Sequence, residues 1–239
     1  MPNHIANKLV VTAKTNEEIN KFVEFIKGNN DNECIDFNTI IPMPEVLKTT
    51  EESSRVHESI LYYLKKNNKL AMAEECLGYS FAIMKDKDFS TIVPHVLEEM
   101  YKEGKKYVEI YETYGSLSWY TWSIANWGTK WNAYDSFLSV WRNIAEIHFD
   151  TAWSGVPKLI DRLSKLFPNL SFDYKYADEN FSSNCGMGST NENVEFVFFD
   201  IEDQSDTAVE TYIECWGYDP EDFYKDENGE WHNKMWEDE

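Results

Sequence analysis

The chain has 239 residues, with 43 Asp and Glu against 22 Lys and Arg, and a formal net charge of −21. Hydrophobic residues make up 42% of it and aromatic residues 15%, which is enough to bury a core and excludes a wholly disordered chain. The charge opposes binding to nucleic acid or to an anionic membrane and favours basic partners or cations, although it is also explained by solubility alone.

Nothing in the sequence predicts export or membrane insertion. No window is apolar over the roughly 18 residues that a membrane span needs, and the N-terminus has no signal-peptide pattern. The four cysteines form no Cys-x-x-Cys pair, which indicates reduced thiols. We therefore expect a cytoplasmic protein, in a bacterial host, whose oligomeric state the sequence leaves open.

The chain begins with a pattern typical of a β-α-β unit. Residues 7–13 form a β-branched run that predicts a strand, and Thr15 occupies the position of an N-cap. Apolar residues at helical spacing follow as far as Gly28. Residues 34–41 (CIDFNTII) alternate between apolar and polar side chains and predict a second strand, which the prolines at 42 and 44 end.

Residues 44–114 change to helical periodicity and predict a mainly helical insertion. We expect one helix around Ile60 and Leu64, a second over residues 70–84, and a third that carries Ile92, Val96 and Met100.

The second half of the chain again predicts β-α-β. Residues 140–148 predict a strand, Pro157 opens a helix, and residues 170–176 predict the next strand. A further strand is expected over 194–201 and a helix over 207–215. Two such units give an α+β fold with a ferredoxin-like split β-α-β sheet. The predicted domains are therefore 1–217, interrupted by the helical insertion, and an acidic, aromatic-containing C-terminal extension over 218–239.

Four segments carry a family resemblance: MPNHIANKLVVT, IIPMP, WSIANWGTKWNAYD and FDTAWSGVPKLIDRLSKLFP. In this order, over residues 1–180, the chain resembles the phage- and plasmid-encoded YubB-type proteins that have a ferredoxin-like domain. The resemblance implies that fold, a helical insertion and a gene carried by mobile elements. It implies no activity and brings no catalytic residues.

The segment NWGTKW is the best candidate for a binding site. A glycine beside Thr and Lys can expose main-chain N–H groups to an anion, although the spacing of a P-loop is absent. The alternative is that the indoles pack over one end of the sheet around a turn at Gly128. The candidate binding residues are Trp122, Asn126, Trp127, Gly128, Thr129, Lys130, Trp131, Asp150 and Trp153.

Few features of the sequence support catalysis or metal binding. His148 and Asp150 would point to the same face of a strand, but a third ligand or a nucleophile at diagnostic spacing is missing. We therefore predict no catalytic residues, no metal and no cofactor, and expect a binding protein rather than an enzyme.

The negative charge is concentrated in the C-terminal third. Residues 171–239 contain twenty acidic residues and three Lys, a net charge of −17, whereas residues 1–170 carry −4. The segment 218–239 mixes acids with aromatic residues. It is either a solvated tail, a tail that docks its rings on its own domain, or a surface for a basic partner. The candidate acidic surface comprises Asp219, Glu221, Asp222, Asp226, Glu227 and Glu230.

These patterns favour an accessory protein of a phage or plasmid that binds and inhibits a basic host protein, such as a nucleic-acid-handling or defence factor. One alternative is a module that binds single-stranded nucleic acid, since ferredoxin-like sheets can present aromatic side chains to bases, although the net charge makes direct nucleic-acid binding unfavourable. The other is a small-molecule-binding protein or enzyme acting around Lys130, His148 and Asp150.

Overall fold

A computed structural model describes residues 3–28, 33–191 and 195–234. The chain divides by its internal contacts into two compact units. Unit 1, which we call the sheet unit, comprises residues 1–42 and 124–239, and unit 2, the helical unit, comprises residues 43–123. The segment 218–234 therefore groups with the sheet rather than standing apart as a tail.

The sheet unit is built on six antiparallel strands in the order β2-β3-β1-β4-β5-β6. Four of these strands, in the order β4-β1-β3-β2, give the ferredoxin-like arrangement with α1 and α8 as its two helices, so the predicted fold is confirmed. The six strands are β1 (His4–Thr12), β2 (Tyr134–Trp141), β3 (Ile144–Ala152), β4 (Ser171–Asp178), β5 (Cys185–Thr190) and β6 (Phe196–Ile201).

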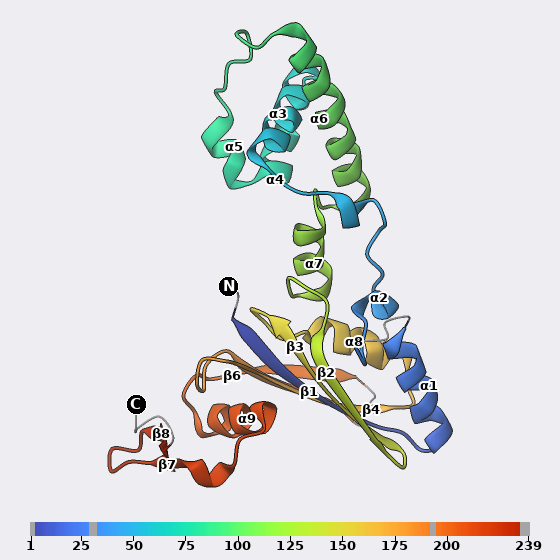
Figure 1. Ribbon diagram of the computed structural model, residues 1–239, viewed down its shortest axis with the longest axis vertical. Helices are drawn as coiled ribbons and strands as arrows, with labels where there is room; N and C mark the ends of the chain where they lie inside the picture. The colour runs from blue at the N-terminus through green and yellow to red at the C-terminus, as the bar shows by residue number, and fades with distance from the viewer. Residues whose placement is uncertain (1–2, 29–32, 192–194, 235–239) are drawn as a thin grey trace. The chain divides into compact units, whose positions relative to one another are not determined.

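Figure 1 shows helices on both faces of this sheet: α1 and α8 on one face and α9 on the other. Buried side chains of β1 alternate accordingly, with Ile5 and Leu9 facing α1 and α8 and Ala6 facing α9. The helices and the short C-terminal hairpin are α1 (Asn16–Lys27), α2 (Phe37–Ile40), α8 (Pro157–Leu166), α9 (Asp206–Trp216), η2 (Pro220–Asp222), β7 (Phe223–Lys225) and β8 (Trp231–Asn233).

Several predicted elements are confirmed. Thr15 caps α1 through a complete capping box with Glu18. Pro157 lies in the first turn of α8, and β4 follows it. The strand predicted from residue 194 begins at Phe196, and its predicted first residue lies outside the described residues. The predicted helix over 207–215 is α9.

The strand predicted over 34–41 is wrong, because this segment forms the short helix α2 instead. The Asp36 carboxylate accepts a hydrogen bond from the main-chain N–H of Asn38, and the side-chain oxygen of Asn132 accepts one from that of Phe37. These bonds pair main-chain N–H groups at the N-terminus of a helix. The alternating sequence pattern does not predict such a helix. Trp127 completes the packing, since its indole N–H donates to the Ile41 carbonyl.

The single strand predicted over 140–148 is also wrong, because a hairpin turn divides it. β2 ends at Trp141, and β3 begins at Ile144. Arg142 takes a positive φ of 55°, a conformation usually marked by Gly or Asn at this position. The strand β5 (CGMGST) was not predicted. Gly186 leaves room for the rings of Tyr176 and Phe198, and Gly188 leaves room for the ring of Phe196.

The helical unit contains η1 (Leu47–Thr49), α3 (Ser54–Lys66), α4 (Ala71–Leu77), α5 (Tyr79–Met84) and α6 (Pro94–Tyr114). The boundary after residue 123 falls within the residues of α7 (Trp119–Trp127). The helix predicted over 70–84 is divided in two, because Gly78 adopts a φ of 51°. Helices α3 and α6 approach so closely that Gly104 lies against the main chain of Ser59. Among the described residues, no helix combines the length and apolarity that crossing a bilayer requires.

Candidate functional site

The predicted tryptophan segment forms a compact cluster around Lys130. The Lys130 ammonium lies 4.7 Å from the ring centroid of Trp131 and 5.0 Å from that of Trp153. Trp153 takes a positive φ of 73° at the end of β3, which turns its ring toward this position. Two indole faces therefore already contact the charge that was expected to bind an anion.

Other members of the segment serve the packing of the sheet unit. Trp127 is buried and meets Phe37 edge to face. Thr129 is buried too, donates to the Ala152 carbonyl at 2.8 Å and accepts the Ala152 N–H. Gly128 accepts a hydrogen bond from the Ser154 hydroxyl, and Asn126 is half-buried. Trp122 is buried in the helical unit. These positions favour the packing alternative for much of NWGTKW.

Asp150 lies beside an imidazole, but a different one from that expected. His148 shares its face of β3, as predicted from the strand period, yet its Nε2 lies 2.8 Å from a carboxylate oxygen of Glu146. The nearby imidazole is that of His4, whose Nδ1 lies 2.8 Å from the Tyr134 hydroxyl. No local pattern indicates His4 or Tyr134, because their approach depends on the pairing of β1, β3 and β2.

The environment of Asp150 disfavours its charge. Burial raises the pKa of Asp150 to about 6, repulsion from Asp135 acts in the same direction, and His4 opposes them. Burial likewise raises the pKa of Tyr134 to about 12. Asp150 is therefore a group that changes its protonation near neutral pH.

This shift has a consequence for stability. The folded state holds the Asp150 proton more tightly than the unfolded chain does, so its ionisation lowers the free energy of unfolding as the pH rises from about 4 to above 6. Asp150 is half-buried, so solvent screening reduces the full effect of this shift, and Asp150→Asn should gain about 2 kcal/mol relative to the wild type over that interval, measured by urea unfolding at several pH values. The control Asp173→Asn removes an exposed carboxylate from β4 and should show no such gain. A gain for Asp150→Asn that is equal at pH 4 and pH 7.5 would contradict the prediction.

The strongest charge lies in what we call the acidic module, residues 202–234, which contains eleven acidic residues against Lys225 and Lys234. Its segments are α9, η2 and the β7–β8 hairpin. Phe223 anchors it: this side chain is 6% exposed and stacks on Phe181 with 5.6 Å between ring centroids. Tyr218 contacts both Phe223 and Tyr212. Rings therefore dock the module on the sheet unit, which was one of the three alternatives for this segment.

The six predicted acidic residues differ in exposure and in the hydrogen bonds that they accept. Asp219 and Asp226 accept hydrogen bonds from the main-chain N–H groups of nearby residues and hold local turns. Asp222 is half-buried, whereas Glu221, Glu227 and Glu230 are exposed. The exposed three are free of such capping roles among the described contacts and can meet a partner. The last five residues, including Trp236, lie outside the described residues.

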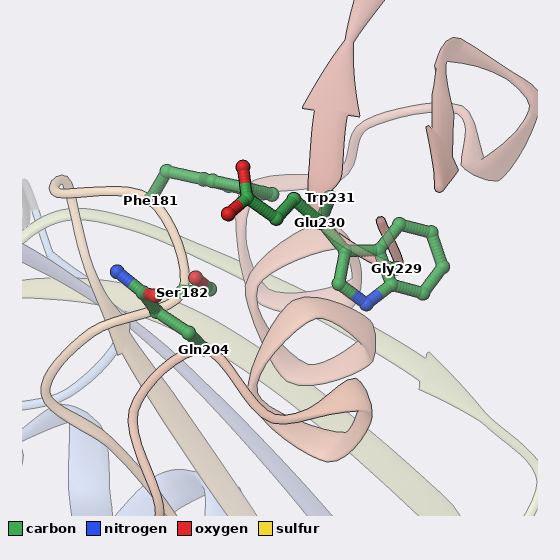
Figure 2. A pocket seen from close by; sticks show the side chains of 6 residues that line it. All are labelled: Phe181, Ser182, Gln204, Gly229, Glu230 and Trp231. Carbon is green, nitrogen blue, oxygen red and sulfur yellow. The ribbon is translucent and has the colours of Figure 1, made fainter. Parts of the chain in front are cut away.

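A pocket of about 340 Å³ lies between the module and the β4–β5 connection. Figure 2 shows that three segments surround it: the β4–β5 connection, the turn before α9 and the β7–β8 hairpin. The main-chain N–H of Gln204 donates to the Ser182 carbonyl, and both residues have positive φ, which fixes two of these segments against each other. The lining residues are Phe181, Ser182, Gln204, Gly229, Glu230 and Trp231.

The pocket combines a carboxylate with aromatic walls. Trp231 is held by a hydrogen bond from its indole N–H to Asp206 and by Lys225, whose ammonium lies 5.2 Å from its ring centroid. Hydrogen bonds from Lys225 and Trp231 lower the pKa of Asp206, which therefore stays ionised. Glu230 supplies the carboxylate of the lining itself. This arrangement suits a cationic side chain, which gains from both charge and ring faces.

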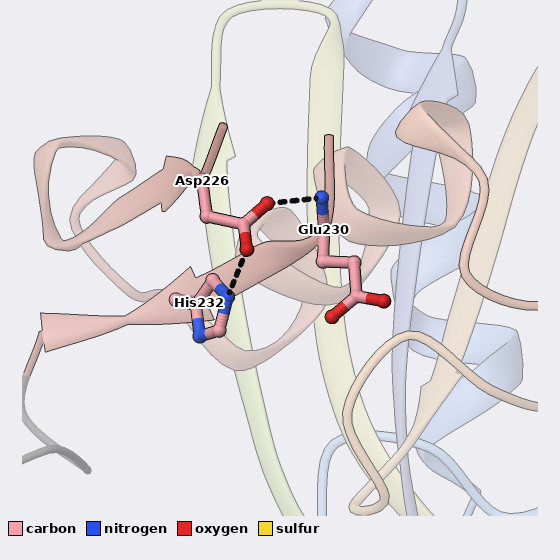
Figure 3. Close-up of side chains that lie close together, drawn as sticks. All are labelled: Asp226, Glu230 and His232. Atoms are coloured by element: carbon pink, nitrogen blue, oxygen red, sulfur yellow. Dashed lines mark hydrogen bonds and ion pairs between the residues drawn. The ribbon is translucent and has the colours of Figure 1, made fainter. Parts of the chain in front are cut away.

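The hairpin turn beside the pocket brings together Asp226, Glu230 and His232, whose ligand atoms lie within 4.8 Å of one another. Figure 3 shows the Asp226 carboxylate between the Glu230 main chain and the His232 ring. Asp226 also accepts hydrogen bonds from Asn228, and the bond from the Glu230 main chain leads the lowering of its pKa. These are the bonds of a tight turn, so we interpret the group as a support that positions Glu230.

The match to a family model agrees with the fold. Residues 126–219 match the family model described as "Ferredoxin-like domain in Api92-like protein". Among solved structures, the crystal structure of a protein api92 from Yersinia pseudotuberculosis is 9% identical, covers 84% of this chain and 99% of that chain, and has a TM-score of 0.42. No curated protein matches the chain.

The family match supports only part of the resemblance described above. It names Api92-like proteins rather than the YubB-type family, and it says nothing of phage or plasmid origin. Its boundaries include the segment NWGTKW and end just after α9. The chain therefore carries a ferredoxin-like domain similar to that of Api92-like proteins.

Proposed function

We propose that this chain binds a basic protein through the acidic module, and that the pocket lined by Glu230, Trp231 and Phe181 takes a Lys or Arg side chain. The observation that supports this most strongly is the position of that pocket, since four of its six lining residues belong to the most acidic part of the chain. Negative surface charge attracts and orients a basic partner, and a carboxylate between aromatic rings can bind one cationic side chain.

The docking of Phe223 supports a preformed surface. Because the rings of the module pack on one another and on Phe181, the exposed acids are held in place before binding. A preformed surface loses less conformational entropy on association than a free tail would.

The class of partner follows from the charge. A protein that handles nucleic acid carries a basic groove, and the acidic module would compete with the phosphate backbone for it. We extend the proposal to inhibition of such a protein in a bacterial cytosol, where a mobile element would benefit from blocking host defence. Direct binding of nucleic acid is disfavoured by the same charge.

The test is an affinity capture from a bacterial lysate with a variant in which three exposed carboxylates of the module are neutralised: Glu221→Gln, Glu227→Gln and Glu230→Gln. The wild type should retain a basic protein in stoichiometric amount, and the triple variant should bind the purified partner about a hundredfold more weakly, since each lost charge–charge contact removes roughly 1 kcal/mol. The affinity is measured by isothermal titration.

A matched triple variant separates the site from the overall charge. Glu24→Gln, Glu74→Gln and Glu99→Gln also remove three exposed carboxylates, but from outside the module, and should bind within about twofold of the wild type. Equal weakening by both triple variants would show that only net charge matters. Capture of nucleic acid instead of protein would favour the nucleic-acid-binding alternative.

A further inference from the structure

The helical unit contains its own pocket, of about 430 Å³, at the start of α7. It lies entirely within residues 43–123 and shares no residue with the acidic module. Its volume falls in the range of small-molecule sites, roughly 300–1,000 Å³. The lining residues are Glu51, Glu52, Ser118, Trp119, Tyr120 and Thr121.

Glu52 is the fixed carboxylate of this pocket. It accepts hydrogen bonds from the hydroxyl groups of Ser118, at 2.5 Å, and Thr121, at 3.0 Å. The Nε2 atom of His57 lies 3.2 Å from its other oxygen. Burial works against the charge of Glu52, but the bonds from His57, Ser118 and Thr121 outweigh it and lower its pKa. Glu52 therefore remains ionised and held in one orientation.

Glu51 adds a second carboxylate at the mouth of the pocket. Its main-chain carbonyl accepts a hydrogen bond from the Tyr107 hydroxyl, which fixes the backbone while the side chain remains exposed. Within the part of the chain that the structure describes, no Lys or Arg forms an ion pair with either Glu51 or Glu52. The negative charge of the pocket is thus not neutralised by a strong base.

The remaining walls are aromatic. Trp119 and Tyr120 are half-buried, and their ring centroids lie 5.9 Å apart in an edge-to-face arrangement. Ring faces beside carboxylates attract organic cations, whose charge is spread over a large and weakly hydrated surface. A small metal ion fits less well, because the oxygens of Glu52 are already directed at two hydroxyls and an imidazole.

We propose that this pocket binds an alkylammonium group, with Glu51 and Glu52 as its counter-charges and Trp119 and Tyr120 as its walls. Such a group occurs in free amines and in the lysine side chains of proteins. The site shares no residue with the acidic module, so its test does not depend on the proposed function.

The test uses three probes: choline, spermidine and Nα-acetyl-lysine amide. Binding is followed through the indole N–H resonance of Trp119, assigned by its loss in Trp119→Leu, with affinities from isothermal titration. At least one probe should shift this resonance saturably. Glu51→Gln should weaken that probe about tenfold, and Trp119→Leu about threefold. Stronger binding of the lysine amide would point to a protein lysine, and stronger binding of choline or spermidine to a free amine.

Two variants serve as controls. Glu74→Gln removes an exposed carboxylate of the same unit and should leave probe binding unchanged, as should the triple variant of the acidic module. Glu51→Gln carries the test because the Glu51 side chain is exposed, whereas Glu52→Gln also disturbs the contacts of Ser118 and Thr121. The proposal is overturned if no probe shifts the Trp119 resonance, or if Glu51→Gln and Glu74→Gln bind equally well.

Discussion

Phe223→Ala is expected to destabilise the sheet unit by about 3–5 kcal/mol, the usual loss when a buried phenylalanine is truncated. The ring is 6% exposed and contacts Phe181, Tyr212 and Tyr218, so its removal leaves a cavity beneath the acidic module. Urea unfolding gives the loss of stability, and limited proteolysis should show new cleavage after residue 217. Partner affinity should fall together with the order of the module.

A matched exposed ring provides the control. Phe199 lies on β6 and is 63% exposed, so Phe199→Ala removes the same atoms without leaving a cavity. Its free energy of unfolding should change by less than about 0.5 kcal/mol. If both phenylalanine variants unfolded at the same urea concentration as the wild type, the module would not be docked through Phe223.

Gly104→Ala is expected to destabilise the helical unit by about 3 kcal/mol or more, although alanine normally favours a helix. A Cβ at this position would lie 2.0 Å from the Ser59 carbonyl oxygen and 2.8 Å from the Cβ of Tyr63. The contact is with main chain, so α3 and α6 would have to move apart. Thermal unfolding followed by circular dichroism should show a lower melting temperature.

The neighbouring position supplies the comparison. Lys105→Ala lies on the exposed face of the same helix and should change stability by less than about 0.5 kcal/mol. A Gly104→Ala variant that is as stable as Lys105→Ala would mean that a Cβ fits between α3 and α6 at this position.

The sequence predicted elements whose signals are local. The Thr15 cap, Pro157 at the start of α8 and the alternation in β4 are each set by side chains within a few residues, and all three are confirmed. Elements that depend on distant residues were predicted wrongly or missed. α2 is held by Asn132, about a hundred residues away, and β5 is specified by rings of neighbouring strands that fill the space over its glycines.

The same difference between local and distant signals applies to the candidate site. Composition indicated the acidic segment, because charge is visible in the sequence. It did not indicate the pocket, since Phe181, Gln204 and Trp231 come from three separate segments. The approach of His4 to Tyr134 likewise needs strand pairing. The pocket at the start of α7 joins Glu51 and Glu52 to residues almost seventy positions later, which no local pattern reveals.

The decisive measurement is the affinity of the purified partner for the wild type and for the triple variant Glu221→Gln, Glu227→Gln and Glu230→Gln, at about 0.05 M and about 0.5 M salt. Binding of the wild type should weaken at least tenfold at the higher salt concentration, and the variant should bind weakly at both with a smaller dependence on salt. Equal affinity of both proteins at both salt concentrations would contradict partner binding through the acidic module.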